Sequence, residues 1–243
     1  MRSFNRGSLE PRPVVIIPQI SMHAEGSVQV EYGNTKVFVT CSVEEKVPPH
    51  VFGTGGGWVT AEYGMLPRAT NTRGAREAAK GKQSGRTQEI QRLIGRSLRA
   101  SVDLQKLGTR TFTIDCDVLQ ADGGTRTASI TGGWVAFALA LRTLQKKRTM
   151  TKLPELMPIA ALSVGVLKGE VLVDLDYEED SAAEVDMNIV ATGDGRLVEV
   201  QGTAEQKSFE RKQLDQMVDA GMAAIAKLVE LQRATLEQLT TGA

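Results

Sequence analysis

The chain has 243 residues, of which 41% are hydrophobic and 24% are charged, and this ordinary globular composition excludes long disordered stretches. Its 29 basic and 29 acidic residues give a formal net charge of zero, so any electrostatic argument for a nucleic-acid partner must come from a local cluster. No run of about 18 uncharged apolar residues occurs, so we expect a cytoplasmic protein with no membrane span, folded as one domain over residues 1–243.

The first part of the chain has the alternation that is typical of strands. Apolar or alternating runs predict strands at residues 14–17, 27–32 and 36–42, with Gly33-Asn34 as a hairpin turn between the second and the third. Another strand is predicted at residues 58–63, after a glycine loop. Cys41 lies in one of these alternating runs, and Cys116 lies in a later one. Neither has a partner at metal-binding spacing, so both are expected to be buried thiols.

A basic segment follows the fourth predicted strand. Within about twenty residues it contains six cations, which only Glu77 opposes: Arg68, Arg73, Arg76, Lys80, Lys82 and Arg86. The segment is poor in large apolar residues, so it is predicted to be a long loop. Its arginines have three possible roles, which are contact with a nucleic acid, contact with another subunit, or exposure to water alone.

The middle of the chain alternates between helix and strand. Helical spacing of apolar residues begins near residue 87 and continues to residue 102, a strand is predicted at residues 112–118, and helical spacing returns at residues 130–141. Between that strand and the second helix lies the loop Gly123-Gly124-Thr125-Arg126-Thr127. A glycine loop that opens a helix is typical of an anion site, although a simple turn without a ligand is about as good an interpretation.

The second half repeats the move from strands to a helix. Strands are predicted at residues 159–166, 171–175, 183–191 and 197–201, and a long amphipathic helix has its buried stripe between residues 214 and 229. The fold class is therefore α/β or α+β with mixed sheets.

An acidic run lies between two of these predicted strands. Residues 174–186 contain seven carboxylates in thirteen positions, which repel one another unless a cation or a shared proton holds them. Asp180 is expected in the turn before a strand, where it can point at Asp186. The functional interpretation is a magnesium site or a general acid, and the alternative is a solvated acidic turn. Together with two arginines at helix starts, Arg86 and Arg126, the run suits phosphoryl transfer.

Four long stretches resemble the signature sequences of the bacterial ribonuclease PH family. They are WVTAEYGMLPRAT at residues 58–70, GRTQEIQRLIGR at 85–96, DCDVLQADGGTRTASITG at 115–132 and EEDSAAEVDMN at 178–188. The resemblance covers nearly the whole chain in the family's order. The chain departs from the family at Asn5-Arg6-Gly7, where a Gly-Arg pair is common, and at residues 142–156, which lack the usual glycine.

The resemblance implies a ribosomal protein S5 domain 2-like fold and a homo-hexamer built as a trimer of dimers. It also implies an activity, which is phosphate-dependent 3′ to 5′ trimming of transfer RNA precursors and other RNAs with release of nucleoside diphosphates. By the family pattern, inorganic phosphate is held by Arg86, Gly124, Thr125 and Arg126. Asp180 and Asp186 serve catalysis and bind Mg²⁺ or another divalent cation. Arg68, Arg73 and Arg76 are expected to contact RNA or a neighbouring subunit.

Two other functions remain open at this point. The chain could be a non-catalytic ring subunit that only binds RNA, although it retains both arginines and both aspartates. It could also be a hydrolytic nuclease, although two anion-holding loops are unnecessary when water attacks. Whether Asp180 acts as a general acid or as a metal ligand is also left open.

Overall fold

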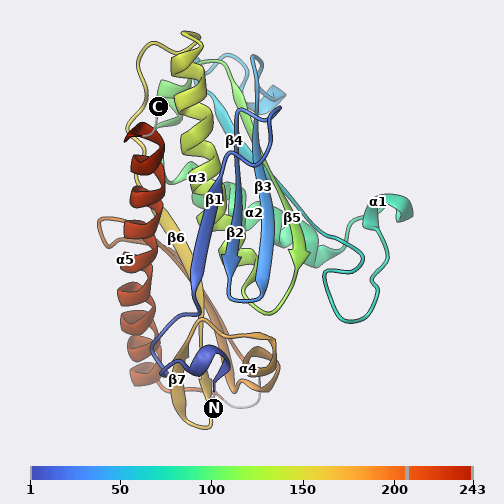
Figure 1. Cartoon of the computed structure of the whole chain (residues 1–243), viewed down its shortest axis with the longest axis vertical. Coiled ribbons are helices and arrows are strands. Elements are labelled where there is room, and N and C mark those ends of the chain that lie inside the picture. Colours follow the sequence, from blue (N-terminus) through green and yellow to red (C-terminus); the bar gives the residue numbers. More distant parts are fainter. Residues whose placement is uncertain (1, 206–207, 242–243) are drawn as a thin grey trace.

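The computed structural model of the protein describes residues 2–205 and 208–241, which form two sheets with helices between and beside them (Figure 1). The strands are β1 (Val14–Pro18), β2 (Gly26–Tyr32), β3 (Thr35–Glu44), β4 (Trp58–Met65), β5 (Thr111–Gln120), β6 (Ile159–Leu167), β7 (Glu170–Val173), β8 (Val185–Thr192) and β9 (Leu197–Ala204). The α-helices are α1 (Glu77–Lys80), α2 (Gly85–Arg99), α3 (Thr125–Lys146), α4 (Tyr177–Ala182) and α5 (Arg211–Thr241). Short 3₁₀ helices are η1 (Ser3–Asn5), η2 (Pro49–Val51) and η3 (Leu104–Leu107).

The two sheets have simple topologies. The first has the order β1-β2-β3-β5-β4 and is antiparallel except for the parallel pair β4 and β5, which α2 connects. The second has the order β7-β6-β8-β9 and is antiparallel throughout. The predicted class, a mixture of helices with mixed sheets, is confirmed.

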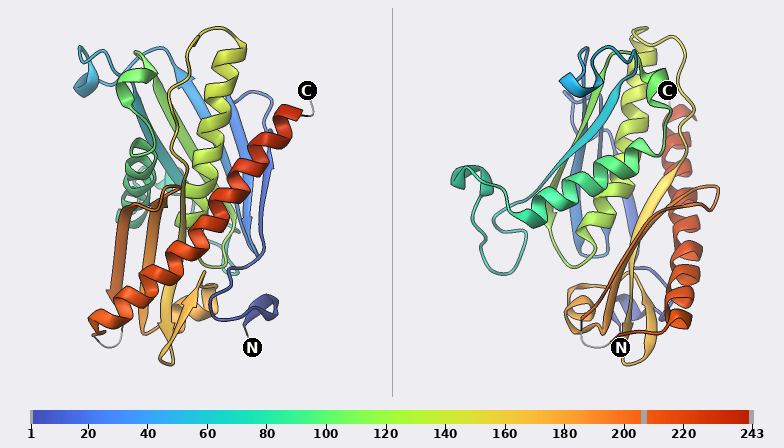
Figure 2. Two further views of the ribbon diagram at one scale, coloured as in Figure 1. Left: turned by 90° about the vertical axis from the view of Figure 1, so that its left-hand side faces the viewer. Right: turned by 180° about the vertical axis from the view of Figure 1, so that it is seen from behind.

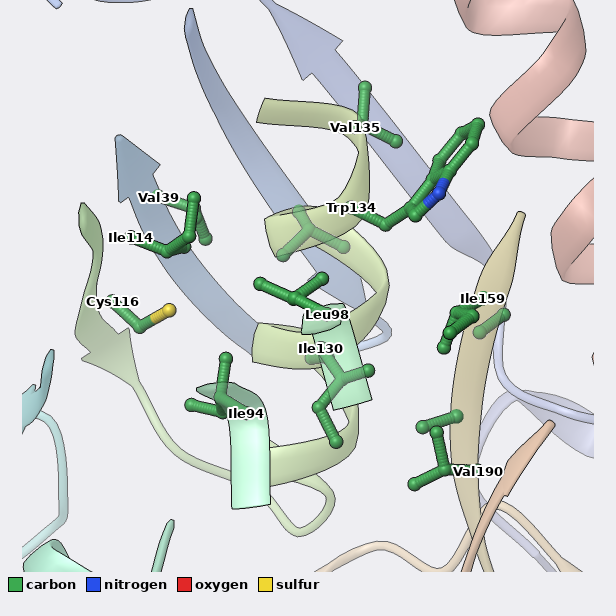
Figure 3. Packing of buried hydrophobic residues seen from close by; sticks show 14 of the residues in the cluster. Val39, Ile94, Leu98, Ile114, Cys116, Ile130, Trp134, Val135, Ile159 and Val190 are labelled. Atoms are coloured by element: carbon green, nitrogen blue, oxygen red, sulfur yellow. The ribbon is translucent and has the colours of Figure 1, made fainter. Parts of the chain in front are cut away.

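Helix α3 lies between the two sheets and is buried along most of its length. Its small residues allow this close packing: a Cβ on Gly132 would lie 2.7 Å from a methyl group of Val30. Ile130 and Trp134 of α3 pack with residues of α2 and of both sheets, so one hydrophobic cluster spans the first and the second half of the chain (Figure 3). The long helix α5 crosses the outer side of the second sheet (Figure 2).

Most of the strands and helices predicted from the sequence are found, with shifts of one to a few residues at their ends. Three predictions were wrong. The basic segment is not a continuous loop, since it contains α1. Asp180 does not lie in a turn, because the acidic run folds into α4, which a capping box between Asp176 and Glu179 starts. The strand predicted at residues 171–175 ends at Val173, because Asp174 has a left-handed backbone with φ of 57°.

Both cysteines, Cys41 and Cys116, are buried and free, as expected. In the described ranges, no helix combines the length and the apolar character that a membrane span needs.

Candidate active site

A cavity of about 370 Å³ opens where the β5–α3 turn, the start of α2, helix α4 and strand β8 meet. Its lining includes all six residues predicted for phosphate binding and catalysis, namely Arg86, Gly124, Thr125, Arg126, Asp180 and Asp186. A second, more open cavity of about 480 Å³ adjoins it and shares Arg86, Arg126 and Asp186. Arg86 and Asp186, which lie 100 positions apart in the chain, are thus brought to one place.

The β5–α3 turn presents the start of α3 to the cavity. Gly124 occupies the N-cap position with φ of 66° and offers no side chain, so no side-chain oxygen caps the amides of the first turn. A helix start of this kind attracts an anion. Thr125 is fixed by a 2.8 Å hydrogen bond between its hydroxyl and that of Tyr63. Arg126 is directed by a 3.0 Å hydrogen bond from its Nη1 to Oε1 of Gln201 on β9.

Arg86 faces the same cavity from the first turn of α2. Ser84 caps that helix by accepting a 3.2 Å hydrogen bond from the Thr87 amide, and Glu77 of α1 accepts a 3.0 Å hydrogen bond from the Thr87 hydroxyl. Arg86 itself is exposed, and within the described part of the chain it forms no ion pair with a carboxylate. Its guanidinium group is therefore available to an anionic ligand.

Asp180 on α4 and Asp186 on β8 both line the cavity. Burial raises the pKa of Asp186 to about 6, and the charge of Asp180 adds to this effect. Burial also raises the pKa of Asp180, although the nearby charges of Arg86 and Arg126 oppose that rise. This pair can therefore hold a proton, or a cation, near neutral pH.

The other carboxylates of the acidic run are neutralised by arginines close to the N-terminus. Arg2 and Arg6 each form a 2.7 Å ion pair with Glu179. Burial tends to raise the pKa of Glu179, but its hydrogen bonds and these two cations outweigh burial and lower it. Asp174 pairs with Arg12, at 2.6 Å, and both side chains are completely buried. Repulsion within the acidic run is thus relieved mostly by cations of the chain itself.

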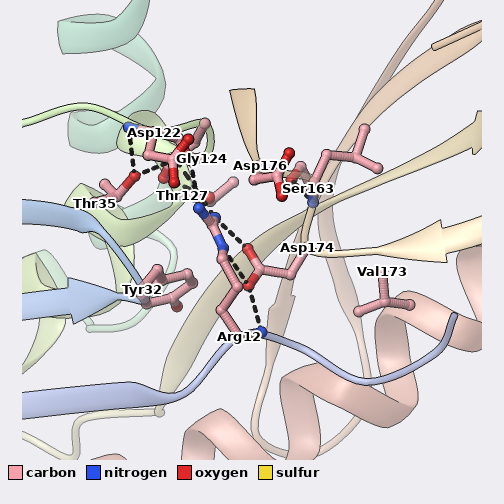
Figure 4. Close-up of polar contacts among 12 residues, drawn as sticks. Arg12, Tyr32, Thr35, Asp122, Gly124, Thr127, Ser163, Val173, Asp174 and Asp176 are labelled. Atoms are coloured by element: carbon pink, nitrogen blue, oxygen red, sulfur yellow. Dashed lines mark hydrogen bonds and ion pairs between the residues drawn. The ribbon is translucent and has the colours of Figure 1, made fainter. Parts of the chain in front are cut away.

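Arg12 connects the β5–α3 turn with Asp174 of the acidic run, as Figure 4 shows. Its guanidinium group and backbone amide donate three hydrogen bonds of 2.6–2.9 Å to the Asp174 carboxylate. The same guanidinium group donates to the carbonyl oxygens of Asp122 and Gly123 in the β5–α3 turn. That turn lies so close to the acidic run that a Cβ on Gly123 would be 2.5 Å from the carbonyl oxygen of Leu175. The β5–α3 turn and α4 are therefore held in one fixed arrangement.

The three arginines predicted to contact RNA or a subunit are not part of this cavity. Arg68, Arg73 and Arg76 are exposed on the segment that contains α1, which projects from the body of the molecule (Figure 1). Arg68 lines a separate cavity, and Arg76 lines another, between the segment and strands β4 and β5. None of the three pairs with a carboxylate in the described ranges, so they remain available to a partner.

Sequence reasoning missed two residues that support the site. Gln201 directs Arg126, and Arg12 ties the loop to the acidic run. Gln201 pairs with Asn188 in the β8–β9 register, so correct pairing of the predicted strands would have placed it beside Asp186. Arg12 lies outside every strand and helix and is 162 residues from Asp174 in the chain. No local sequence pattern predicts a contact between residues so far apart.

Metal donors at the cavity are few. Nowhere in residues 2–205 and 208–241 do three or more His, Cys, Asp or Glu residues gather in the way that a complete metal cage requires. The cavity itself offers the two carboxylates of Asp180 and Asp186 and the side chain of Asn188. Oxygen donors of this kind suit Mg²⁺, which commonly keeps several waters and binds one or two carboxylates together with substrate phosphates.

Comparison with known proteins gives a consistent result. Two models of the 3′ exoribonuclease family match the chain, domain 1 over residues 10–142 and domain 2 over residues 157–224. Among solved structures, Rrp46 from rice (Oryza sativa) is 17% identical, with a TM-score of 0.78, covering 97% of this chain and 100% of that chain. A subunit of the Archaeoglobus fulgidus exosome with RNA bound to the active site is 24% identical, with the same TM-score of 0.78, covering 94% and 91%. A chain of an archaeal exosome core is 23% identical, with a TM-score of 0.73, covering 94% and 89%.

Proposed function

This chain belongs to the 3′ exoribonuclease family, and from that premise we propose that it is a phosphate-dependent 3′ to 5′ exoribonuclease of the ribonuclease PH type. Its substrates are the 3′ ends of transfer RNA precursors and other RNAs, its products are nucleoside 5′-diphosphates, and its site of action is the cytoplasm. The observation that carries the proposal is the single cavity in which Arg86, Arg126, Asp180 and Asp186 meet.

The arginines account for the use of phosphate as the attacking group. Inorganic phosphate and the terminal phosphodiester are both anions, and they repel each other unless cations lie between or beside them. Arg86, Arg126 and the uncapped start of α3 supply that positive potential and align the attacking oxygen. A water nucleophile is neutral and needs no such arrangement, so phosphorolysis uses this cavity better than hydrolysis does.

The reaction forms one phosphorus–oxygen bond and breaks another. An oxygen of inorganic phosphate attacks the phosphorus that links the last two nucleotides, and the bond from this phosphorus to the 3′ oxygen of the penultimate nucleotide breaks. The terminal nucleotide leaves as a diphosphate, and the shortened RNA keeps its 3′ oxygen, which must gain a proton. A protonated Asp180 or Asp186 can donate that proton, and the raised pKa values of both support this role. Because the bonds exchanged are similar in energy, the reaction is readily reversible.

Asp180 and Asp186 also fit a divalent cation, Mg²⁺ or a similar ion, with Asn188 beside them. Such an ion, when bound, would stabilise negative charge on the leaving oxygen. General-acid and metal-ligand roles for Asp180 are both consistent with its position.

Omission of phosphate from an RNA-trimming assay tests the proposal. We expect a transfer RNA precursor with a 3′ extension to be shortened one nucleotide at a time only when phosphate is present, with nucleoside diphosphates as the products. Trimming without phosphate that releases monophosphates would show a hydrolytic nuclease instead. Binding of RNA without any product under either condition would show a ring subunit that lacks catalysis.

We further propose that the protein assembles as a homo-hexamer, a trimer of dimers, and that Arg68, Arg73 and Arg76 bind the body of the RNA or a neighbouring subunit. Support comes from their exposure on a projecting segment that has little apolar surface of its own.

Replacement of these three arginines by Ala is expected to weaken binding of transfer RNA precursors. It should also lower the slope of log affinity against log salt by roughly two to three, because each phosphate contact contributes slightly less than one. Phosphorolysis of short single strands should change much less, since Arg86 and Arg126 remain. Binding would be measured at several salt concentrations, beside a control in which the exposed Arg148, Arg211 and Arg233 are replaced.

Sedimentation of the same variants separates the two roles. A triple variant that stays hexameric and keeps an unchanged salt slope would contradict a role in RNA binding. If the variant dissociates to dimers, and precursor binding is lost only in the dimeric form, the three arginines act through assembly.

A further inference from the structure

Tyr177 is an aromatic residue that the fold exposes beside the candidate active site. It is the first residue of α4, and 62% of its surface is accessible. Tyr32 and Tyr63, the other two tyrosines, are 0% and 5% exposed and form hydrogen bonds in the core. Neither hydrophobic cluster of the described residues includes the Tyr177 ring, and an exposed aromatic ring beside a polar cavity can stack on a base.

The position of Tyr177 is fixed by the segment that carries it. Asp176 caps α4 through the capping box with Glu179, and the backbone N–H of Tyr177 donates a 3.2 Å hydrogen bond to Oδ1 of Asp122. Asp122 lies in the β5–α3 turn, which Arg12 holds. The backbone of Tyr177 is thus fixed both by α4 and by the β5–α3 turn. Its hydroxyl group forms no hydrogen bond with any residue in the described ranges.

Tyr177 lines two cavities at once. One is the catalytic cavity of about 370 Å³, where it is the only aromatic residue among the described lining residues. The other is a wider cavity of about 910 Å³, which is large enough for a nucleotide and whose lining includes Asn34, Arg68, Asn71, Gln120 and Asp122. The side-chain amides of Asn34 and Gln120 already donate hydrogen bonds, to Asp122 and to the Asn34 carbonyl oxygen, whereas that of Asn71 has none among the described residues. Amide groups of this kind pair well with sugar and base edges. Arg68 connects the wider cavity with the basic segment.

We propose that Tyr177 stacks on the base of the penultimate nucleotide, the one that becomes the new 3′ end after each cleavage. This inference rests on the proposed function. The retained strand is assigned to the wider cavity because the basic segment, which would carry the body of the RNA, borders that cavity through Arg68. Stacking on an aromatic ring accepts every base, which suits an enzyme that removes all four nucleotides in turn.

Kinetics with abasic substrates test the proposal. Tyr177→Ala should reduce kcat/KM for a short RNA by about 10- to 100-fold, whereas Tyr177→Phe, which keeps the ring, should stay within about twofold. An RNA that lacks only the penultimate base should lose a similar factor with the wild-type enzyme, and Tyr177→Ala should cost nothing further on it. Phe52→Ala is the control, because Phe52 is 82% exposed and lines neither cavity.

Binding without turnover supplies a second readout. In the absence of phosphate, an RNA with 2-aminopurine at the penultimate position should lose fluorescence on binding to the wild-type protein and to Tyr177→Phe, but not to Tyr177→Ala. The phosphate dependence of any remaining activity should be the same in all variants. Loss of that dependence in the wild-type enzyme would instead count against the proposed function itself.

Three results would overturn the inference. The first is an equal loss for Tyr177→Ala on normal and on penultimate-abasic RNA, which would indicate a structural role. The second is a loss that disappears only when the terminal base is missing, which would place the ring on the departing nucleotide. The third is a normal rate and normal quenching with Tyr177→Ala.

Discussion

Asp180→Asn is expected to abolish turnover in both directions, with a fall of at least about 10³-fold in the rates of phosphorolysis and of RNA synthesis from diphosphates. The amide has nearly the same shape as the carboxylate, but it cannot donate a carboxylic proton or contribute charge to a cation site. Both rates would be measured beside Glu155→Gln, which changes an exposed carboxylate that lines none of the cavities described above. A variant with a rate close to that of the wild type would reduce the acidic pair to an ordinary solvated cluster.

The same variant should also change the titration of its neighbour. The pKa of Asp186 is raised to about 6 by burial and, secondarily, by the charge of Asp180, so Asp180→Asn should lower it without returning it to the usual value. Above pH 6 the charged Asp186 opposes folding, because its pKa in the folded state exceeds that in the unfolded state, and this penalty fades as the pH falls through 6. Removal of Asp180 should therefore leave the midpoint of thermal unfolding at neutral pH unchanged or raised. Carboxyl NMR and calorimetry would measure the two effects, and a lower midpoint would mean that the lost activity reflects damage to the fold.

Arg126→Ala is expected to lower kcat/KM for phosphate by about 10- to 150-fold, because one charge-assisted contact with an anion is lost from a partly buried site. Affinity for RNA measured without phosphate should remain, since the basic segment is unchanged. Arg92→Ala, which removes an exposed arginine from α2 away from the cavity, is the matched control. An unchanged response to phosphate concentration would show that the loop does not bind phosphate.

The pH dependence of Arg126→Ala gives an independent check. The charge of Arg126 lowers the pKa values of both Asp180 and Asp186, so its removal should raise them. Any step that needs one of these groups ionised should then begin at a higher pH than in the wild-type enzyme. A pH–rate profile that does not move would mean that the guanidinium group lies farther from the carboxylates than the structure places it.

The sequence predicted local features of the fold well, because alternation and helical spacing depend on neighbouring residues. The strand, glycine loop and helix around Gly124 are one example, and the hairpin at Gly33 is another. The six residues expected to bind phosphate and carry out catalysis lie around one cavity, while their roles stay predictions.

Features that depend on distant contacts were not predictable in this way. Asp174 continues an apolar strand pattern, yet its strand ends before it, because the carboxylate turns toward Arg12. The acidic run was expected to need a bound cation or a shared proton. In the fold, Arg2, Arg6 and Arg12 form ion pairs with two of its carboxylates, Glu179 and Asp174. No pattern in the N-terminal segment predicts that these arginines contact the acidic run.

The buried pair of Arg12 and Asp174 also determines when, during synthesis, the site can become complete. Arg86 and Arg126 emerge from the ribosome first, and the strands of the first sheet can pair around them. The β5–α3 turn beside Arg126 is held by Arg12, and Arg12 gains its ion pair only when Asp174, 162 residues later in the chain, has also emerged. Asp180 and Asp186 emerge still later. A nascent chain therefore has no assembled candidate site for most of the time that it spends on the ribosome.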